Sequence, residues 1–478
     1  MIRAGGLLLG SELSSTVLLF LRNILVARLL SVEDFGIAAT FAILWTLIET
    51  AGNFSVQKLL VQSPAGDEPR LQDTLHLLQV VRGLVSAAVM LALARPYAAF
   101  VQTPELVWAY QVLALVPLLR GFIHLDVFRV QRGMDFWPQA VMNVASPAVS
   151  LLAVGAIWLI FPDWRVMLGA IVMQHAAALA LSHALARRRF GLAWEWGHVR
   201  SSVGFGGPLA INGLLMMAVM QGERMLVANQ TDLVTLGWFS AAFLMAVTPA
   251  RVLPNTISGM FLPGLSRDRE AIGRDGGAAF RARALLLGEV SVCAGIWLML
   301  GMAVLGPPLL VGLFGPGYAA GASVLVILGL AQGLRTARTF CTTTALAAGH
   351  TWDVTATGVL RAVGVAVALW VLWRGYGVAG LAWTGVAFEL AALVLGLILV
   401  SRRQGVPVVR LAGALSVCGA ALVLAAWELW AAPPSGALRE VLDPGHALLA
   451  AVLLAAPLAM PRLRGLIAAR LLRGGRVG

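Results

Sequence analysis

Residues 377–400 read GVAGLAWTGVAFELAALVLGLILV and contain a single ionisable side chain, Glu389. A helix of this length rises about 36 Å, which is enough to cross the ~30 Å hydrocarbon core of a bilayer. Segments of the same character recur along the whole chain of 478 residues, of which 59% are apolar and only 12% are charged. Soluble globular chains carry about 25% charged residues. The composition therefore predicts an all-α polytopic membrane protein.

Dividing the apolar segments at their polar interruptions predicts about fourteen transmembrane helices, which use most of the chain. The ninth of them contains Gly306, Pro307 and Pro308, and it can be interpreted as a span plus a re-entrant or interfacial piece around these residues. The predicted helices lie at 6–28, 36–56, 75–99, 106–128, 138–160, 166–186, 203–228, 233–262, 284–314, 319–346, 354–373, 377–400, 408–430 and 446–468.

The distribution of basic residues predicts the orientation of these helices. If the N-terminus is cytoplasmic, the inner segments hold 22 Lys and Arg residues and the outer segments hold 5. Short cytoplasmic loops carry an excess of Lys and Arg. We therefore expect both termini in the cytoplasm.

The longer inner loops divide the predicted helices into two halves. We expect an N-terminal lobe at 1–190 with helices 1–6, a C-terminal lobe at 201–405 with helices 7–12, and two further helices with a basic cytoplasmic tail at 406–478. A short repeat supports this division, because Leu25-Val26-Ala27 and Gly36 recur 201 residues later as Leu226-Val227-Ala228 and Gly237. Six helices in each half predict a parallel repeat about an axis along the membrane normal.

Eight arginines lie within predicted helices: Arg22, Arg82, Arg120, Arg224, Arg251, Arg335, Arg338 and Arg361. An arginine facing lipid at the bilayer centre costs about 2.5–3.5 kcal/mol on the lenient insertion scale. Most of the eight must therefore meet water or a partner. One alternative is snorkelling or pairing with a carboxylate, such as Arg224 with Glu223 or Arg22 with Glu12 or Glu49. The other is a water-filled cationic cavity.

Long polar helix faces favour the cavity. Arg335 and Arg338 share one face with Gln332, and Glu49 and Asn53 belong to a polar stripe on the second predicted helix. Interhelical hydrogen bonding is the alternative explanation of these stripes. A cationic lumen predicts an anionic cargo, and arginine suits phosphate because its planar fork makes bidentate contacts. The candidate substrate-binding residues are Arg22, Arg82, Arg120, Arg251, Arg335, Arg338, Arg361, Asn53 and Gln332, and the candidate ion-coupling residues are Glu49 and Glu12.

Other classes of function have little support in the sequence. The three cysteines and seven histidines lack metal-ligand spacing, so we expect no metal, no cofactor and no catalytic centre. The net charge of +12 is explained by inner loops and intramembrane arginines, and we expect no nucleic acid partner. A membrane glycosyltransferase, polymerase or ligase would need a large external loop, and all predicted outer loops are short.

Several stretches, in this order, resemble bacterial oligosaccharide flippases of the multidrug/oligosaccharidyl-lipid/polysaccharide exporter superfamily. They cover about residues 5–405 and are Arg22–Leu30 with Val32–Gly36, Glu223–Val227 with Leu236–Ala242, Phe261–Arg267, Phe314–Tyr318 and Ala347–His350. The resemblance implies two six-helix lobes that alternate access to a central cavity. It also implies a location in the inner membrane of a bacterial cell and an undecaprenyl-pyrophosphate-linked oligosaccharide as cargo, for O-antigen, capsule or exopolysaccharide assembly. Arg22 stands where an arginine of helix 1 binds cargo in the related lipid II flippases.

Two other functions within the superfamily stay open at this point. A cation-coupled multidrug exporter would need acidic residues rather than arginines in its cavity, and a lipid II flippase would differ in the glycan that it carries. Besides the lipid-linked oligosaccharide and membrane lipids, a polysaccharide polymerase and the chain-length machinery are possible partners.

Overall fold

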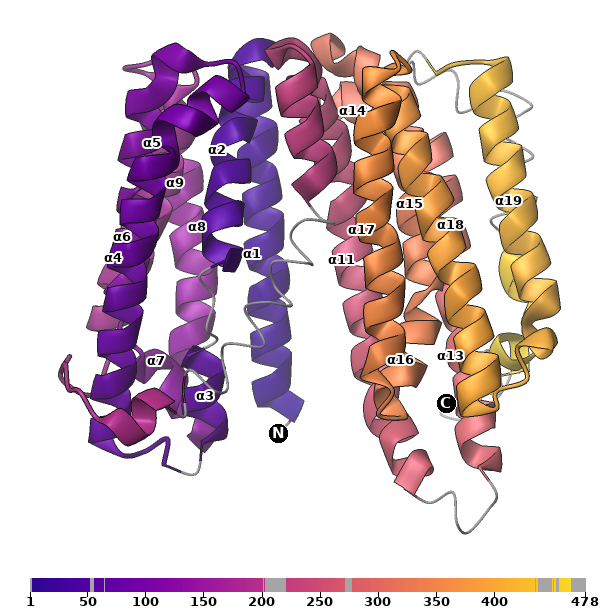
Figure 1. Ribbon diagram of the computed structural model, residues 1–478, viewed down its shortest axis with the longest axis horizontal. Helices are drawn as coiled ribbons and strands as arrows, with labels where there is room; N and C mark the ends of the chain where they lie inside the picture. Colours follow the sequence, from indigo (N-terminus) through magenta and orange to yellow (C-terminus); the bar gives the residue numbers. More distant parts are fainter. Residues whose placement is uncertain are drawn as a thin grey trace, which may run out of the picture. The chain divides into compact units, whose positions relative to one another are not determined.

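A computed structural model describes residues 2–51, 56–63, 65–200, 202, 221–270, 277–434, 436, 449, 451–452 and 455–465 (Figure 1). All regular secondary structure in these residues is helical. The chain forms two compact units, Met1–Gly237 and Trp238–Gly478. This division falls later in the chain than the lobe boundary that we expect between 190 and 201, and the lobe boundaries stay a prediction.

The first unit is built on long helices that lie side by side (Figure 1). α1 packs along α8, α8 packs along α9, and α4 packs along α6. Short helical segments connect them. The elements are α1 (Ile2–Leu29), α2 (Val32–Ala51), α3 (Val56–Gln62), α4 (Pro69–Phe100), η1 (Pro104–Leu106), α5 (Val107–Leu113), α6 (Leu115–Gly121), α7 (Asp126–Arg129), η2 (Val130–Gly133), α8 (Trp137–Trp158) and α9 (Arg165–Ala184).

In the second unit, α13 packs against both α15 and α19, and α17 packs along α18. α11 begins in the last residues of the first unit and continues into the second. The elements are α11 (Leu233–Glu270), α13 (Ala278–Val304), α14 (Gly306–Phe314), η3 (Pro316–Gly321), α15 (Ala322–Ala337), α16 (Thr339–Ala347), α17 (Thr351–Trp373), α18 (Gly377–Gln404), η4 (Val408–Leu411), α19 (Ala412–Ala431) and η6 (Ala456–Ala459).

Within the described residues, ten helices are long and apolar enough to cross a membrane. The number is eleven if Pro104–Gly121 and Asp126–Gly133, which are bent by 52°, form one span. The all-α polytopic membrane fold is thus confirmed, whereas the number fourteen stays a prediction. α2 carries three acidic residues and is not among the ten, and the predicted spans at 203–228 and 446–468 lie largely outside the described residues.

The ninth predicted span consists of two helices, and the re-entrant or interfacial position of the second stays a prediction. α13 ends at Val304, and α14 begins at Gly306, immediately before Pro307 and Pro308. Because proline has no N–H to donate, it is tolerated in the first turn of a helix. The two prolines therefore start a new helix after α13 instead of extending it.

Two glycines of the sequence repeat pack against each other's helix. A Cβ added to Gly36 would lie 2.0 Å from the carbonyl oxygen of Leu233, and one added to Gly237 would lie 2.1 Å from that of Val32. Val32 and Leu233 are separated by the same 201 residues as the two glycines. The first turns of α2 and α11 therefore contact each other closely within the first unit, and the repeat stays a prediction.

Candidate functional site

Arg22 is a buried guanidinium that, among the described residues, is bonded to neutral groups alone. Its side chain lies between three helices, where Nη1 donates to Ser150 Oγ of α8 at 3.1 Å and to Gln174 Oε1 of α9 at 2.9 Å. The residue is 9% exposed, and its Nε has no hydrogen-bond acceptor in the part of the chain that the structure describes. Among the described residues no carboxylate forms an ion pair with it, so neither Glu12 nor Glu49 is its partner. A buried charge without a counterion costs several kcal/mol.

Two ring side chains, His175 and Trp45, lie between the residues that bind Arg22 and a second arginine of the same unit, Arg120. His175, next to Gln174 in α9, is buried and meets the ring of Trp45 edge-on at 5.0 Å between ring centroids. The guanidinium carbon of Arg120 lies 5.6 Å from the centroid of Trp45. Such a cation–π contact holds a guanidinium at a fixed place.

Glu49 of α2 bridges two arginines from neighbouring elements. Arg120 Nη2 of α6 lies 2.7 Å from Glu49 Oε1, and Arg82 Nη2 of α4 lies 3.1 Å from Glu49 Oε2. These two arginines therefore have a carboxylate partner, as the ion-pair alternative predicts, and their role in a cavity stays a prediction. The group keeps a surplus of one positive charge, and Arg22 is a further guanidinium group of the same unit, without a carboxylate partner among the described residues.

The second unit contains a comparable group that is more deeply buried. Glu389 of α18 forms ion pairs with two arginines: its Oε1 lies 2.6 Å from Nε of Arg361 in α17, and its Oε2 lies 3.4 Å from Nε of Arg338. Arg338 lies between α15 and α16. Arg335 adds a further positive charge near this carboxylate. Gln332 is buried on α15, and its Oε1 has no donor among the described residues. The three charged side chains at the centre are at most 10% exposed.

Three of the candidate residues do not join these groups within the described structure. Arg251 is exposed on α11, and Glu12 is exposed on α1; each lacks a side-chain hydrogen bond or ion pair to another described residue. Asn53 lies outside the described residues. Arg224, which we paired with Glu223 as one alternative, donates to Gln221 Oε1 at 3.4 Å.

Several residues of these sites were not chosen from the sequence. Ser150 and Gln174 hold Arg22, and Glu389 holds Arg338 and Arg361. The available signal was weak: the polar pair Gln174-His175 interrupts the apolar segment 166–186, and Glu389 is the one acid of 377–400.

A separate ionic network lies at a loop of the first unit. Arg129 and Arg132 both reach Asp67, at 3.3 Å and 3.1 Å, and hydrogen bonds from these guanidinium groups lower the pKa of that carboxyl. The network borders a pocket of about 400 Å³ that Asp135 and Arg187 also line. These arginines are paired with aspartates, so the network is best explained as the connection between α3, η2 and the chain after α9.

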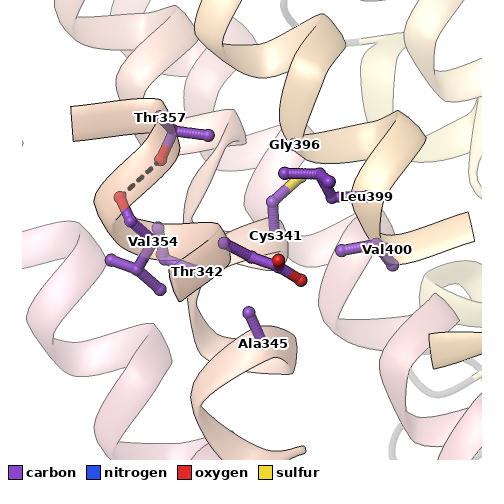
Figure 2. A pocket seen from close by; sticks show the side chains of 9 residues that line it. Cys341, Thr342, Ala345, Val354, Thr357, Gly396, Leu399 and Val400 are labelled. Carbon is purple, nitrogen blue, oxygen red and sulfur yellow. Dashed lines mark hydrogen bonds between the residues drawn. The ribbon is translucent and has the colours of Figure 1, made fainter. Parts of the chain in front are cut away.

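The small cavity near Cys341 and Gly396 cannot hold a sugar. Figure 2 shows side chains of α16, α17 and α18 converging on it, including Thr342 and Thr357. Its volume is about 10 Å³, which is close to the space of one water molecule. Among the described residues there is also no group of three His, Cys, Asp or Glu residues that could hold a metal ion.

Comparisons with solved structures show the fold. The lipid II flippase MurJ in an inward closed conformation superposes with a TM-score of 0.69 over 99% of this chain and 100% of that one, at 12% identity. An inward-facing multidrug resistance MATE family transporter of the MOP superfamily gives a TM-score of 0.66 over 82% of this chain and 94% of that one, at 13% identity. The chain thus has the fold of these transporters, as the resemblance predicted.

Comparisons of sequence give the family. The succinoglycan biosynthesis transport protein ExoT of Rhizobium meliloti (strain 1021) is 25% identical over 322 residues, which are 65% of this chain and 62% of that protein. The names of these relatives are those of transporters and flippases and not of enzymes. The profile of the family described as polysaccharide biosynthesis protein matches residues 25–320. The chain is therefore a multi-pass membrane protein that belongs to the polysaccharide biosynthesis protein family.

Proposed function

We propose that the protein is a flippase that moves an undecaprenyl-pyrophosphate-linked oligosaccharide from the cytoplasmic to the outer leaflet of the inner membrane. The observation that carries this proposal is Arg22, a buried guanidinium with only neutral partners among the described residues. Such a group is stabilised when an anion arrives. A pyrophosphate that links a prenyl chain to a sugar carries one negative charge on each phosphorus, and it also offers oxygens for bidentate contacts with guanidinium groups.

The charges of four side chains in the first unit support an anionic cargo. Glu49 pairs with Arg82 and Arg120, and Arg22 is bonded to neutral groups among the described residues, so three guanidinium groups and one carboxylate leave an excess of two positive charges. This excess equals the charge of the pyrophosphate diester. The same balance disfavours the alternative of a multidrug exporter for cationic drugs, because a cation would be repelled.

The remaining features of the mechanism follow from this proposal. The pyrophosphate and glycan occupy a polar cavity between the lobes at 1–190 and 201–405, while the prenyl tail stays in the bilayer and avoids a transfer cost of about 0.8 kcal/mol per CH₂. The lobes alternate between inward-open and outward-open states, with both termini in the cytoplasm and helices 13 and 14 at 406–478 as an appendage. A sodium or proton gradient drives release. Glu49 is a better coupling candidate than Glu12, because it contacts two arginines.

The identity of the glycan distinguishes this proposal from a lipid II flippase. The name of the Rhizobium relative refers to succinoglycan, an exopolysaccharide, and this favours a surface or secreted polymer as the product. A polysaccharide polymerase and the chain-length machinery are then the expected partners. Deletion of the gene separates the two functions: it removes a surface polymer if the proposal is correct, and it is lethal if the cargo is lipid II.

Transport by arginine variants in vesicles tests the proposal. We expect Arg22→Ala and Arg335→Ala to reduce flipping of an undecaprenyl-pyrophosphate-linked glycan at least tenfold. Arg95→Ala is a matched control, because Arg95 is exposed near the end of α4 and its loss removes the same charge outside the site. Wild-type transport by both test variants, inserted at normal levels, would refute the role of these arginines.

A further inference from the structure

The two Arg–Glu–Arg groups have the same chemistry but differ in how accessible they are. In the first unit the side chains of Arg120, Glu49 and Arg82 are 31%, 18% and 13% exposed. In the second unit the side chains of Arg338, Glu389 and Arg361 are all at most 10% exposed. Only the first group can therefore exchange its carboxylate for another anion without opening its own unit.

We propose that Glu49 is an exchangeable internal counterion, which holds Arg82 and Arg120 in the empty protein and gives way to a phosphate of the cargo. This inference rests on the proposed function and adds a positioning residue to it. Glu49 does not bind the cargo; it acts through the two arginines.

The geometry of Glu49 resembles that of a bound phosphate. Its Oε1 lies 2.7 Å from Arg120 Nη2, and Arg82 Nη2 donates to Oε2 at 3.1 Å and to Oε1 at 3.3 Å. Two oxygens of one phosphate can contact two guanidinium groups in a similar way. Without an anion between them Arg82 and Arg120 would repel each other. Glu49 therefore keeps the two guanidinium groups convergent, and Trp45 supports Arg120 from the side.

Exchange of the counterion lowers the affinity for the cargo and so allows its release. The energy of the cargo's contact with Arg82 and Arg120 is reduced by that of the contact with Glu49 that it replaces. After translocation the carboxylate can return and compete with the phosphate for the same N–H groups. Glu49 thus lowers affinity and speeds release, which is useful to a transporter because tightly bound cargo would not leave.

Binding and transport by Glu49→Gln test the inference with the full chain. We expect the purified variant to bind farnesyl pyrophosphate at least threefold more tightly than the wild type, with farnesol as the probe that lacks phosphate. In vesicles the same variant should show a lower KM and a lower maximal rate for the undecaprenyl-pyrophosphate-linked glycan. Glu33→Gln is the matched control, because Glu33 lies exposed on the same helix and has no arginine partner among the described residues; it should leave both values unchanged.

The possible results separate the inference from the proposed function. If the wild type binds farnesyl pyrophosphate but Glu49→Gln binds it equally or more weakly, Glu49 is no exchangeable counterion, and the flippase proposal stands. If the wild type does not prefer farnesyl pyrophosphate to farnesol, and Arg22→Ala transports normally, the proposed function itself fails. Glu49→Asp keeps the charge but draws the carboxylate back by one carbon, and it should bind with intermediate affinity. Should Glu49→Gln not fold, weaker binding by Glu49→Asp would overturn the inference.

Discussion

Replacement of Glu389 by alanine should strongly destabilise the second unit. The change leaves Arg338 and Arg361 without the carboxylate that they share at 3.4 Å and 2.6 Å. Breaking a buried ion pair by removing one partner costs about 3–5 kcal/mol, and we expect the upper part of that range because two cations lose their counterion. For a unit of this size each kcal/mol lowers the melting temperature by about 2–4 °C, so we expect a loss on the order of 10 °C.

A thiol-reactive dye can follow this transition, since Cys293, Cys341 and Cys418 are free and buried and become reactive when the chain unfolds. The purified variant is heated in detergent beside the wild type. A second variant combines Glu389→Leu with Arg338→Met and Arg361→Met, which removes every charge at similar volume, and it should recover most of the lost stability. An unchanged melting temperature for Glu389→Ala would show that the carboxylate does not neutralise these arginines.

Three further predictions concern the first unit. Gln79→Leu should cost about 1–3 kcal/mol, measured by the same thermal assay, because Gln79 Nε2 donates to the carbonyls of Arg120, Gly121 and Ile123 at 3.1, 3.3 and 2.8 Å; an equal melting temperature would contradict it. Gly36→Val should abolish the monodisperse peak in size-exclusion chromatography, because its Cβ would collide with the Leu233 carbonyl. Gly155→Val is the control and should elute normally, because a Cβ at Gly155 has open space around it. Normal elution of both variants would contradict the close contact of α2 with α11. Because the pKa of Asp67 is lowered in the folded protein, its pairing with Arg129 and Arg132 stabilises the protein above the ordinary aspartate pKa, and this stability is lost as pH falls through the pKa of the folded state. Asp67→Asn should therefore have a lower melting temperature than the wild type at neutral pH and the same melting temperature in acid. A difference in melting temperature that does not change with pH would refute the assignment.

The helices were predictable from the sequence because the bilayer imposes a local rule. A span must be about 20 apolar residues long, so segments such as 377–400 can be recognised without knowledge of their neighbours. The break at Gly306 was predictable for a similar reason, since two adjacent prolines act on their own helix. The same rule predicts a span at 36–56, but the three acids of α2 reduce its apolar character, and this span stays a prediction.

The partners of the arginines were not predictable in the same way. That arginines lie inside helices is visible in the sequence, but Arg22 meets Ser150 and Gln174, which are 128 and 152 residues away. Glu49 is closer to Arg22 in the sequence, yet it pairs with Arg82 and Arg120, because α4 and α6 pack together and present both guanidinium groups to α2. Such choices depend on tertiary packing and not on spacing.

Recognition of the pyrophosphate is the central claim, and a comparison of two lipids in vesicles tests it most directly. The wild-type protein is given one glycan attached either to undecaprenyl pyrophosphate or to undecaprenol without phosphate, and the rate of appearance in the opposite leaflet is measured for each. The account predicts fast movement of the pyrophosphate-linked glycan and at most background movement of the neutral one. Equal rates for the two lipids would contradict it.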